Sequence, residues 1–292
     1  MPRPRGLLKI DIHTHMNRNP ETVQERLFAN KILGFSKCVL LSSAQTQLPN
    51  NVLSPFLPED AYELACKYPD SFAWMCNVDP DGTDATCEKV RKYAEMGAVG
   101  LGEFTTRYRF DDPRMDHLFA CLEELRLPFL FHMAPEDSDK YYGIVDDPRL
   151  PGLERALSKF PELIFVGHSQ PFWFEIAETD ETDPDKRNGF PFGKTGEGRL
   201  YELMRNYPNL YCDLSANSGT NAILRDQEQG LRFIDEFQDR LMFGTDWIIG
   251  NMPFVYALST WLDYMHMKGR ISHEAYEKIC CGNAERLYFS RS

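Results

Sequence analysis

The stretch LIFVGH at residues 163–168 decides the fold class of this chain, and LMFGTD at residues 241–246 repeats its pattern. In both stretches the apolar residues follow one another directly, without the apolar and polar alternation that marks a strand exposed on one face. Continuous apolar strands are typical of parallel sheets that are covered on both faces. Each stretch ends in a polar residue, His168 or Asp246. The sequence therefore indicates an α/β protein with buried parallel strands.

Similar short runs recur along the chain, and segments of helical composition separate them. The strands are predicted at 7–12, 38–41, 72–78, 98–103, 128–132, 163–168, 210–214 and 240–246. The helices are predicted at 21–33, 58–68, 84–96, 113–125, 153–160, 197–207 and 221–237, and two more follow the last strand. Eight such units favour closure into a single (β/α)8 TIM barrel. The periodicity by itself is also compatible with an open, doubly wound sheet.

One domain is the simplest organisation of the 292 residues. A barrel of about 250 residues with short extensions accounts for this length, and no repeat or flexible linker divides the chain. We therefore expect a single domain over 1–292. The polar segment 175–196, EIAETDETDPDKRNGFPFGKTG, is expected to be a loop insertion after the sixth strand, as a functional lid or a mobile loop.

Composition narrows the classes of function. The formal net charge of -12 repels a phosphate backbone, so nucleic acid is not an expected partner. The eight cysteines form no CxxC pair, which indicates reduced thiols. No apolar run reaches the roughly 18 residues of a membrane span, and the N-terminus has no apolar stretch of signal-peptide length. We expect a soluble, cytoplasmic protein that acts on a small molecule, and a homo-oligomer is left open.

Polar residues of the ligand type stand at the carboxyl ends of the predicted strands, which share one rim of a parallel barrel. They are His13, His15, Glu103, His132, His168 and Asp246. A single histidine at such a place is more often a satisfied core residue, but six such residues together are hard to explain in that way. His13 and His15 are two positions apart, so their imidazoles face the same side of an extended segment.

Nitrogen and oxygen donors without a thiolate suit a divalent metal. Zn2+ is expected first, and Mn2+, Co2+ and Fe2+ are also compatible, as one ion or two. Asp11 has the same parity as the two histidines of the first strand. It is predicted either to support them from behind or to be a paired charge inside the barrel.

The sequence resembles the amidohydrolase superfamily, in particular its amidohydrolase 2 branch of metal-dependent hydrolases and decarboxylases. The resemblance runs along almost the whole chain and rests on KIDIHTHMN (9–17), PFLFHMA (128–134), FPELIFVGHSQPFW (160–173), YPNLYCDLSAN (207–217), DRLMFGTDW (239–247) and CCGNAERLY (280–288). It implies that His13, His15 and Asp246 bind one metal. It further implies that His132 and His168 are additional ligands or catalytic groups.

Glu103 is the more particular feature of this resemblance. The stretch AVGLGEF at 98–104 looks like the fourth strand of the TatD-type and phosphotriesterase-like branches, in which a carboxylate can bridge two metals. Many decarboxylases of the amidohydrolase 2 branch resemble this chain elsewhere but lack that bridge. Glu103 therefore favours hydrolysis and a site for two metals. The alternative for this residue is a buried ion pair with Arg107 or Arg109.

We expect a metal-dependent hydrolase that activates water to cleave an ester, lactone, amide or similar bond in a small organic molecule. Asp246 is the expected proton carrier, and His168 is the alternative base. The first alternative function is a non-oxidative decarboxylase or hydratase of the same superfamily. A TatD-like nuclease is a further alternative, which the negative net charge disfavours. A metal that only stabilises the barrel remains a non-enzymatic alternative.

The loops after the strands build the pocket of such a barrel. The candidate substrate contacts in them are Arg107, Arg109, Glu136, Gln170, Trp173, Asn217 and Trp247. The arginines suit an acidic group on the substrate, because a guanidinium fork matches a carboxylate or phosphate, although each is equally suited to a surface ion pair. The three remaining histidines lie in or near predicted helices and are not assigned to the site.

Overall fold

The computed structural model describes residues 8–44, 56–247 and 252–290, so residue 7 of the first predicted strand lies outside the described residues. The strands of the barrel are β1 (Lys9–Thr14), β2 (Phe35–Leu40), β3 (Phe72–Trp74), β4 (Leu101–Phe104), β5 (Phe129–Ala134), β7 (Phe165–His168), β8 (Leu210–Asp213) and β9 (Leu241–Met242). Each overlaps a predicted run, although β2 begins three residues earlier than predicted and β3 and β9 are shorter. A further short strand, β6 (Ile144–Val145), pairs with the end of β5.

The strands close into a ring. Two parallel sheets, β1-β2-β3 and β4-β5-β7-β8-β9, meet at two seams. At one seam a parallel bridge joins Cys76, just after β3, to Leu101 in β4. At the other, the N–H of Ile12 donates to the carbonyl of Phe243 at 3.2 Å. The predicted (β/α)8 barrel is therefore confirmed, and the open doubly wound sheet is excluded.

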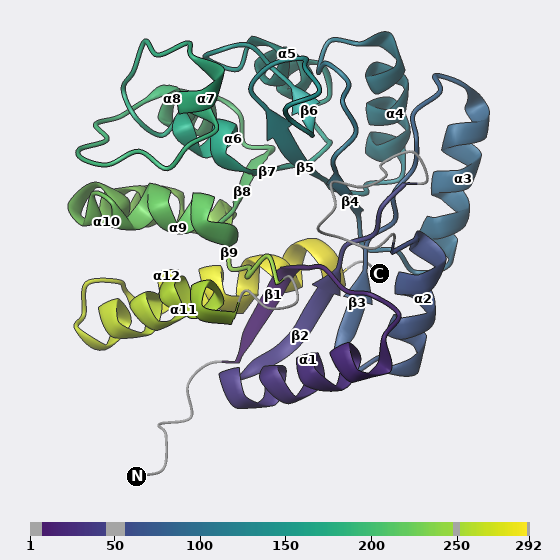
Figure 1. Cartoon of the computed structure of the whole chain (residues 1–292), viewed down its shortest axis with the longest axis horizontal. Coiled ribbons are helices and arrows are strands. Elements are labelled where there is room, and N and C mark those ends of the chain that lie inside the picture. Colours follow the sequence, from purple (N-terminus) through teal and green to yellow (C-terminus); the bar gives the residue numbers. More distant parts are fainter. Residues whose placement is uncertain (1–7, 45–55, 248–251, 291–292) are drawn as a thin grey trace.

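Helices lie around the outside of the strands (Figure 1). They are α1 (Pro20–Leu33), α2 (Pro58–Lys67), α3 (Asp84–Glu95), α4 (Pro113–Glu124), α5 (Pro151–Lys159), α6 (Gln170–Phe174), α7 (Pro184–Arg187), α8 (Arg199–Asn206), α9 (Ala216–Leu224), α10 (Gln227–Phe237), α11 (Met252–Met267) and α12 (His273–Glu277), with short turns η1 (Gln238–Arg240), η2 (Lys278–Gly282) and η3 (Glu285–Phe289). Several begin with proline, whose missing N–H is not needed in the first turn. In the described part of the chain, no helix has the length and apolarity that crossing a bilayer requires.

The predicted helix 221–237 is wrong in one respect, because the segment forms two helices. At Asp226 the backbone leaves the helical region, with φ -132° and ψ 83°. The Asp226 carboxylate accepts a hydrogen bond from the N–H of Thr195 at 3.2 Å. Gly230 packs close to the end of α9, since a Cβ atom at position 230 would lie 2.2 Å from the carbonyl oxygen of Ile223. This break depends on tertiary contacts that helical composition does not reveal.

The segment 175–196 contains α7 and is packed against the loop that follows β5. Arg187 is buried and donates to the carbonyl oxygen of Pro135 at 3.0 Å. Asp185 accepts hydrogen bonds from Lys140 and Tyr141 of the same loop. The centre of this segment is therefore packed structure at the carboxyl end of the barrel, rather than only a loose connection.

Apolar side chains fill the inside of the barrel below the polar rim. Leu130 on β5 and Val166 on β7 belong to one buried cluster, together with Met242 on β9. His132 and His168 stand two positions further along the same two strands, so they point to the same side as the apolar residues. The polar residues at the rim therefore rest on a packed apolar core.

Candidate functional site

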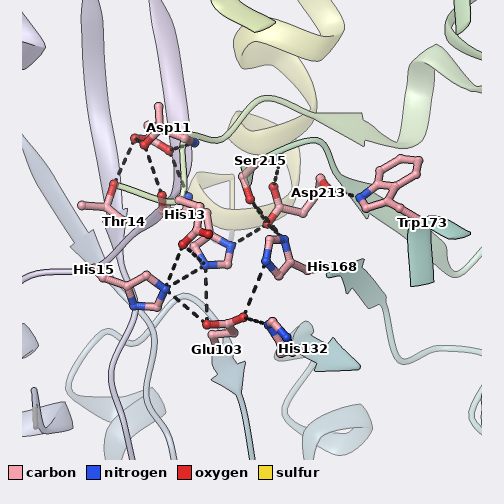
Figure 2. A network of polar contacts seen from close by, with 12 residues as sticks. Asp11, His13, Thr14, His15, Glu103, His132, His168, Trp173, Asp213 and Ser215 are labelled. Atoms are coloured by element: carbon pink, nitrogen blue, oxygen red, sulfur yellow. Dashed lines mark hydrogen bonds and ion pairs between the residues drawn. The ribbon is translucent and has the colours of Figure 1, made fainter. Parts of the chain in front are cut away.

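The structure brings together all six residues that the sequence singled out as ligands, at the carboxyl ends of the strands. Figure 2 shows how the four histidines and Glu103 face one another. The six residues are His13 on β1, His15 just after it, Glu103 on β4, His132 on β5, His168 on β7 and Asp246 after β9. All except His15 and Asp246 are buried. Their convergence follows from the parallel barrel, because it gathers strand ends that are far apart in sequence.

Glu103 stands at the centre of this cluster, between two pairs of histidines. Its Oε2 lies 3.2 Å from Nε2 of His15 and 3.6 Å from Nε2 of His13. Its Oε1 lies 2.9 Å from Nδ1 of His132 and 3.7 Å from Nε2 of His168. Each carboxylate oxygen therefore faces a different pair of imidazoles.

Asp246 completes the first of these two groups. Its Oδ1 lies 3.4 Å from Nε2 of His13 and 3.2 Å from Nε2 of His15. The backbone N–H of Asp246 donates to the carbonyl of His13 at 2.9 Å, so closure of the barrel sets its position. The side chain of Asp246 is 21% exposed, against 7% for Glu103. It is the carboxylate of the cluster that solvent reaches most easily.

Asp213, at the end of β8, is a site residue that the sequence analysis missed. Its Oδ2 accepts a hydrogen bond from Nδ1 of His13 at 2.6 Å and lies 3.2 Å from Nδ1 of His168. Ser215 donates its hydroxyl to the same oxygen at 2.8 Å. With the Nδ1–H held in this way, Nε2 of His13 faces Glu103 and Asp246, where it carries a proton in the metal-free protein and would be a ligand once that proton is lost. Asp213 stands at the carboxyl end of the predicted strand 210–214, as Glu103 does in the strand 98–103, so the same criterion would have selected it.

Asp11 supports His13 through the backbone rather than through the imidazole ring, since its Oδ1 accepts the N–H of His13 at 3.1 Å. Its carboxylate is paired with Arg26 of α1 and accepts the hydroxyl hydrogen bond of Thr245 at 2.6 Å. The pairing of β1 with β2 shifts register between Asp11 and Thr14, which breaks the simple alternation along the strand. The alternative that we considered, a paired buried charge, describes Asp11.

The charges of the cluster compensate one another. Burial acts to lower the pKa of His13, but the charges of Asp213, Asp246 and Glu103 outweigh it and hold that pKa well above its usual value. Burial acts to raise the pKa of Glu103, yet the neighbouring histidines hold it well below its usual value. The pKa of His15 is likewise raised, to about 9, so the metal-free protein balances its charged carboxylates with protons on His13 and His15.

These donors fit a divalent cation. The Nε2 atoms of His13 and His15 are 3.0 Å apart, so the two nitrogens can share one proton or bind one cation together. Three groups of three donors have ligand atoms within 4.8 Å of one another, and they share members: His13, His168 and Asp246; His13, His15 and Glu103; Glu103, His132 and His168. Nitrogen and carboxylate oxygen donors of this kind suit Zn2+, Mn2+, Co2+ and Fe2+.

Tyr142, on the loop after β5, is a second residue that the sequence analysis missed. Its ring stacks on His132, with centroids 4.2 Å apart and an interplanar angle of 27°. The residue is 46% exposed, so one part of the ring meets solvent at the mouth of the site. Burial of the hydroxyl, together with the charges of Glu103 and Asp246, raises the pKa of Tyr142 above its usual value. No strand-end signal marks such a loop residue in the sequence.

The two arginines predicted to contact substrate are engaged in ion pairs. Arg107 pairs with Asp137 at 3.2 Å, and Arg109 pairs with Asp147 at 2.8 Å. Glu103 contacts histidines instead, so the alternative in which one of these arginines pairs with it is wrong. The ion-pair alternative that we considered for the arginines themselves agrees with these contacts.

The remaining predicted substrate contacts differ in their surroundings. Trp173 is buried in α6, and the buried ring of Trp247 lies 4.7 Å from the guanidinium carbon of Arg26. Trp247 therefore packs toward α1 rather than presenting its face to a ligand. The other three are half-buried Gln170 and the exposed residues Glu136 and Asn217.

Comparisons with known proteins agree with this fold and with the donor set. The sequence model of the amidohydrolase family matches residues 10–289. No curated protein matches the sequence.

Three similar solved structures illustrate the likeness. A TIM-barrel protein from Bordetella bronchiseptica is 18% identical, with a TM-score of 0.65 over 96% of this chain and 98% of that one. A 2,6-dihydroxybenzoate decarboxylase from Rhizobium is 19% identical, with a TM-score of 0.60 over 96% and 98%. A 5-carboxyvanillate decarboxylase from Novosphingobium aromaticivorans, solved with manganese and a nitrobenzoic acid, is 17% identical, with a TM-score of 0.62 over 97% of each chain.

At these identities the likeness shows the fold. The similar proteins include several decarboxylases, and some were solved with manganese. The comparisons therefore agree better with the alternative function, non-oxidative decarboxylation, than with hydrolysis. They support a divalent metal but give no particular support to zinc.

Proposed function

The chain belongs to the amidohydrolase family, and from that premise we propose that it is a metal-dependent hydrolase of a small organic ester, lactone or amide. The observation that supports hydrolysis is the position of Glu103, whose two oxygens face two separate pairs of histidines. A carboxylate shared in this way suits two ions a few ångströms apart, which is the arrangement of many hydrolytic two-metal centres.

In this proposal His13, His15, Asp246 and Glu103 would hold one ion, and Glu103, His132 and His168 would hold the other. Ions in such sites lower the pKa of water and polarise a carbonyl oxygen. The two ligand groups share Glu103, so loss of this residue affects both sites at once.

The protein's own groups then orient the site and move the proton. Burial acts to raise the pKa of Asp246, but in the protein without a metal the charge of His13 and the hydrogen bond from His15 lower it, and a bound cation would favour the ionised carboxylate in the same way. As the most accessible carboxylate of the cluster, it accepts a proton from water and passes it to the leaving group. Asp213 holds the rings of His13 and His168 in place during this transfer.

A second candidate reaction is non-oxidative decarboxylation of a small aromatic or unsaturated acid. The observation that favours it is the presence of several decarboxylases among the similar structures. Loss of carbon dioxide leaves an electron pair on carbon, which must take up a proton. His168 in its protonated form, or Asp246 after it has taken up a proton from solvent, is placed to deliver it. We rank hydrolysis first because Glu103 is a feature of this chain itself, whereas the likeness to the decarboxylases shows the fold.

One experiment separates the two reactions. Purified protein loaded with Mn2+ or Zn2+ is offered phenyl acetate, γ-butyrolactone and 2,6-dihydroxybenzoate, and both carbon dioxide release and 18O uptake from water are measured. Hydrolysis predicts 18O in the acid product. Decarboxylation predicts release of carbon dioxide and an aromatic product that has taken up no 18O. Release of carbon dioxide from the benzoate, with no turnover of ester or lactone, would reverse our ranking.

The variant Glu103→Gln tests the two-metal proposal directly. We expect two metal ions per wild-type chain and a loss of at least one in the variant, because an amide supplies one weaker oxygen instead of two charged ones. Glu175→Gln is the matched control, since Glu175 is also buried but pairs with Arg187 in a different part of the protein. Equal metal content in wild type and Glu103→Gln would contradict the shared carboxylate.

A further inference from the structure

Two cysteines and a histidine lie together in the layer of helices around the barrel. Cys87 belongs to α3, and His117 and Cys121 belong to the neighbouring helix α4 (Figure 1). The sulfur atom of Cys87 lies 3.6 Å from Nε2 of His117. The thiol of Cys121 donates to the backbone carbonyl of Cys87 at 3.8 Å. None of the three belongs to the donor cluster, so the proposed reaction makes no use of them.

Packing of α3 against α4 brings the two thiols within reach of each other. Both are free, and burial, followed by a hydrogen bond with the thiol of Cys87, raises the pKa of Cys121 to about 12. One turn further along the helices, Arg91 donates to the carboxylate of Glu124 at 2.9 Å. This exposed ion pair contributes little stability, but it shows that the two helices stay in contact beyond the cysteines.

The two thiols differ in their access to solvent. Cys121 is 3% exposed, whereas Cys87 is only partly buried. The side chain of His117 is 34% exposed, so its ring can take up the proton of the Cys87 thiol and exchange it with solvent. A small dissolved oxidant such as hydrogen peroxide therefore reaches Cys87 first, and the buried thiol of Cys121 lies beside it.

Cys66 illustrates why the second thiol matters. It is exposed on α2, and its hydrogen-bond partner is the hydroxyl of Tyr62 rather than a thiol. An oxidised thiol without a thiol neighbour stays a sulfenic acid, is oxidised further or cross-links two molecules. An oxidised Cys87 has Cys121 within reach, so the expected product is a disulfide within one chain.

We propose that Cys87 and Cys121 form a modification site for hydrogen peroxide, which oxidises the pair to an intramolecular disulfide while His117 accepts the first proton. The disulfide would join the helices before and after β4, the strand that carries Glu103. It closes a loop of the unfolded chain around that strand, and such a closure favours the folded state. The inference does not depend on the reaction at the donor cluster.

The oxidation takes two steps. The sulfur of Cys87 attacks one oxygen of the peroxide, the O–O bond breaks, and the proton held by His117 goes to the departing hydroxide, which leaves as water. The sulfur of Cys121 then attacks the sulfenic sulfur of Cys87, the S–O bond breaks, and the proton of Cys121 leaves with the hydroxyl group as a second water. One peroxide molecule thus takes up the two electrons that the two thiols lose.

The test is treatment of the reduced full chain with hydrogen peroxide, followed by a count of free thiols in denaturant and by tryptic peptide mapping. We expect loss of two of the eight thiols and a cross-link between Cys87 and Cys121, which lie on the tryptic peptides 68–89 and 115–126. Cys121→Ser should instead leave a sulfenic acid on Cys87 that dimedone traps. Cys66→Ser is the control, because it removes an exposed thiol outside the pair and should leave the cross-link unchanged.

The variant His117→Gln tests the role of the histidine. It should reach the same cross-link at least about 10-fold more slowly, because glutamine cannot take up the thiol proton. Equal oxidation rates in wild type and in folded His117→Gln would overturn the role of His117. Eight free thiols after the treatment, or a cross-link that joins other cysteines, would overturn the site itself. These measurements need neither substrate nor bound metal, so their outcome is independent of the proposed hydrolysis.

Discussion

Replacement of Asp213 by asparagine tests how the protein prepares its histidines for a metal. The carboxylate is fully buried and accepts the Nδ1–H of His13 at 2.6 Å. The same oxygen lies 3.2 Å from Nδ1 of His168. Asparagine keeps the volume but removes the charge and offers one acceptor oxygen in place of two. At least one ring therefore loses its charged acceptor and the orientation that depends on it.

The size of the effect follows from these contacts. A hydrogen bond to a charged group contributes about 1.5 to 3 kcal/mol, which corresponds to about 10-fold to 150-fold in an equilibrium constant. Changes to residues that hold ligating histidines typically lower metal affinity about 10-fold to 100-fold. We therefore expect Asp213→Asn to weaken metal binding by about 10-fold to 100-fold while the protein stays folded.

The assay is competition of the protein with a chromophoric chelator for Mn2+ and for Zn2+, with circular dichroism to verify folding. Asp226→Asn is the matched control, because Asp226 is also a buried carboxylate but accepts hydrogen bonds from Thr195 and Lys194, outside the cluster. A folded Asp213→Asn variant with the metal dissociation constant of wild type would refute the role assigned to Asp213.

Three further predictions follow from individual contacts. Asp246→Asn should lower kcat about 100-fold to 10,000-fold and keep most of the metal, because an amide can coordinate but cannot carry the proton; near-normal turnover would remove Asp246 from proton transfer. Tyr142→Leu should raise KM for an aromatic substrate about 2-fold to 10-fold while Tyr142→Phe changes it little, since the ring provides the stacking surface over His132; equal KM values for both variants would contradict this. Burial raises the pKa of Asp146 to about 6, above the pKa of an unfolded aspartate. As the pH rises, the unfolded state therefore releases this proton before the folded state does. The free energy of unfolding of wild type should fall by about 3 kcal/mol between about pH 4 and pH 6. Urea unfolding of Asp146→Asn should lack that decline, and parallel pH profiles for the two proteins would rule the explanation out.

The barrel and its six candidate ligands were predictable from the sequence for a simple reason. Continuous apolar runs mark strands buried on both faces, and parallel connections place the end of every such strand at one rim. A polar residue at the end of an apolar run, such as His168 or Asp246, is therefore directed to that rim whatever its distance along the chain. The same rule overlooked Asp213 only because it was not applied to the seventh strand.

Other features depended on contacts that no local pattern encodes. Asp11 shares the parity of His13, but a register shift between β1 and β2 places its carboxylate against Arg26. Arg107 stands close to Glu103 in sequence and pairs instead with an aspartate of the next loop. Tyr142 reaches the site because its loop folds back over β5 and stacks the ring on His132.

The sequence by itself determined the parallel α/β class, the edge of the strands on which the site lies and the chemical type of its donors, because strand periodicity and connection handedness act locally and repeat along the chain. Only the tertiary structure decided how the donors face one another. The two oxygens of Glu103 are divided between two histidine pairs because closure of the barrel brings β4 opposite β1 and beside β5. The distances between side chains on different strands depend on the tilt and stagger of the closed ring, which are properties of the whole barrel.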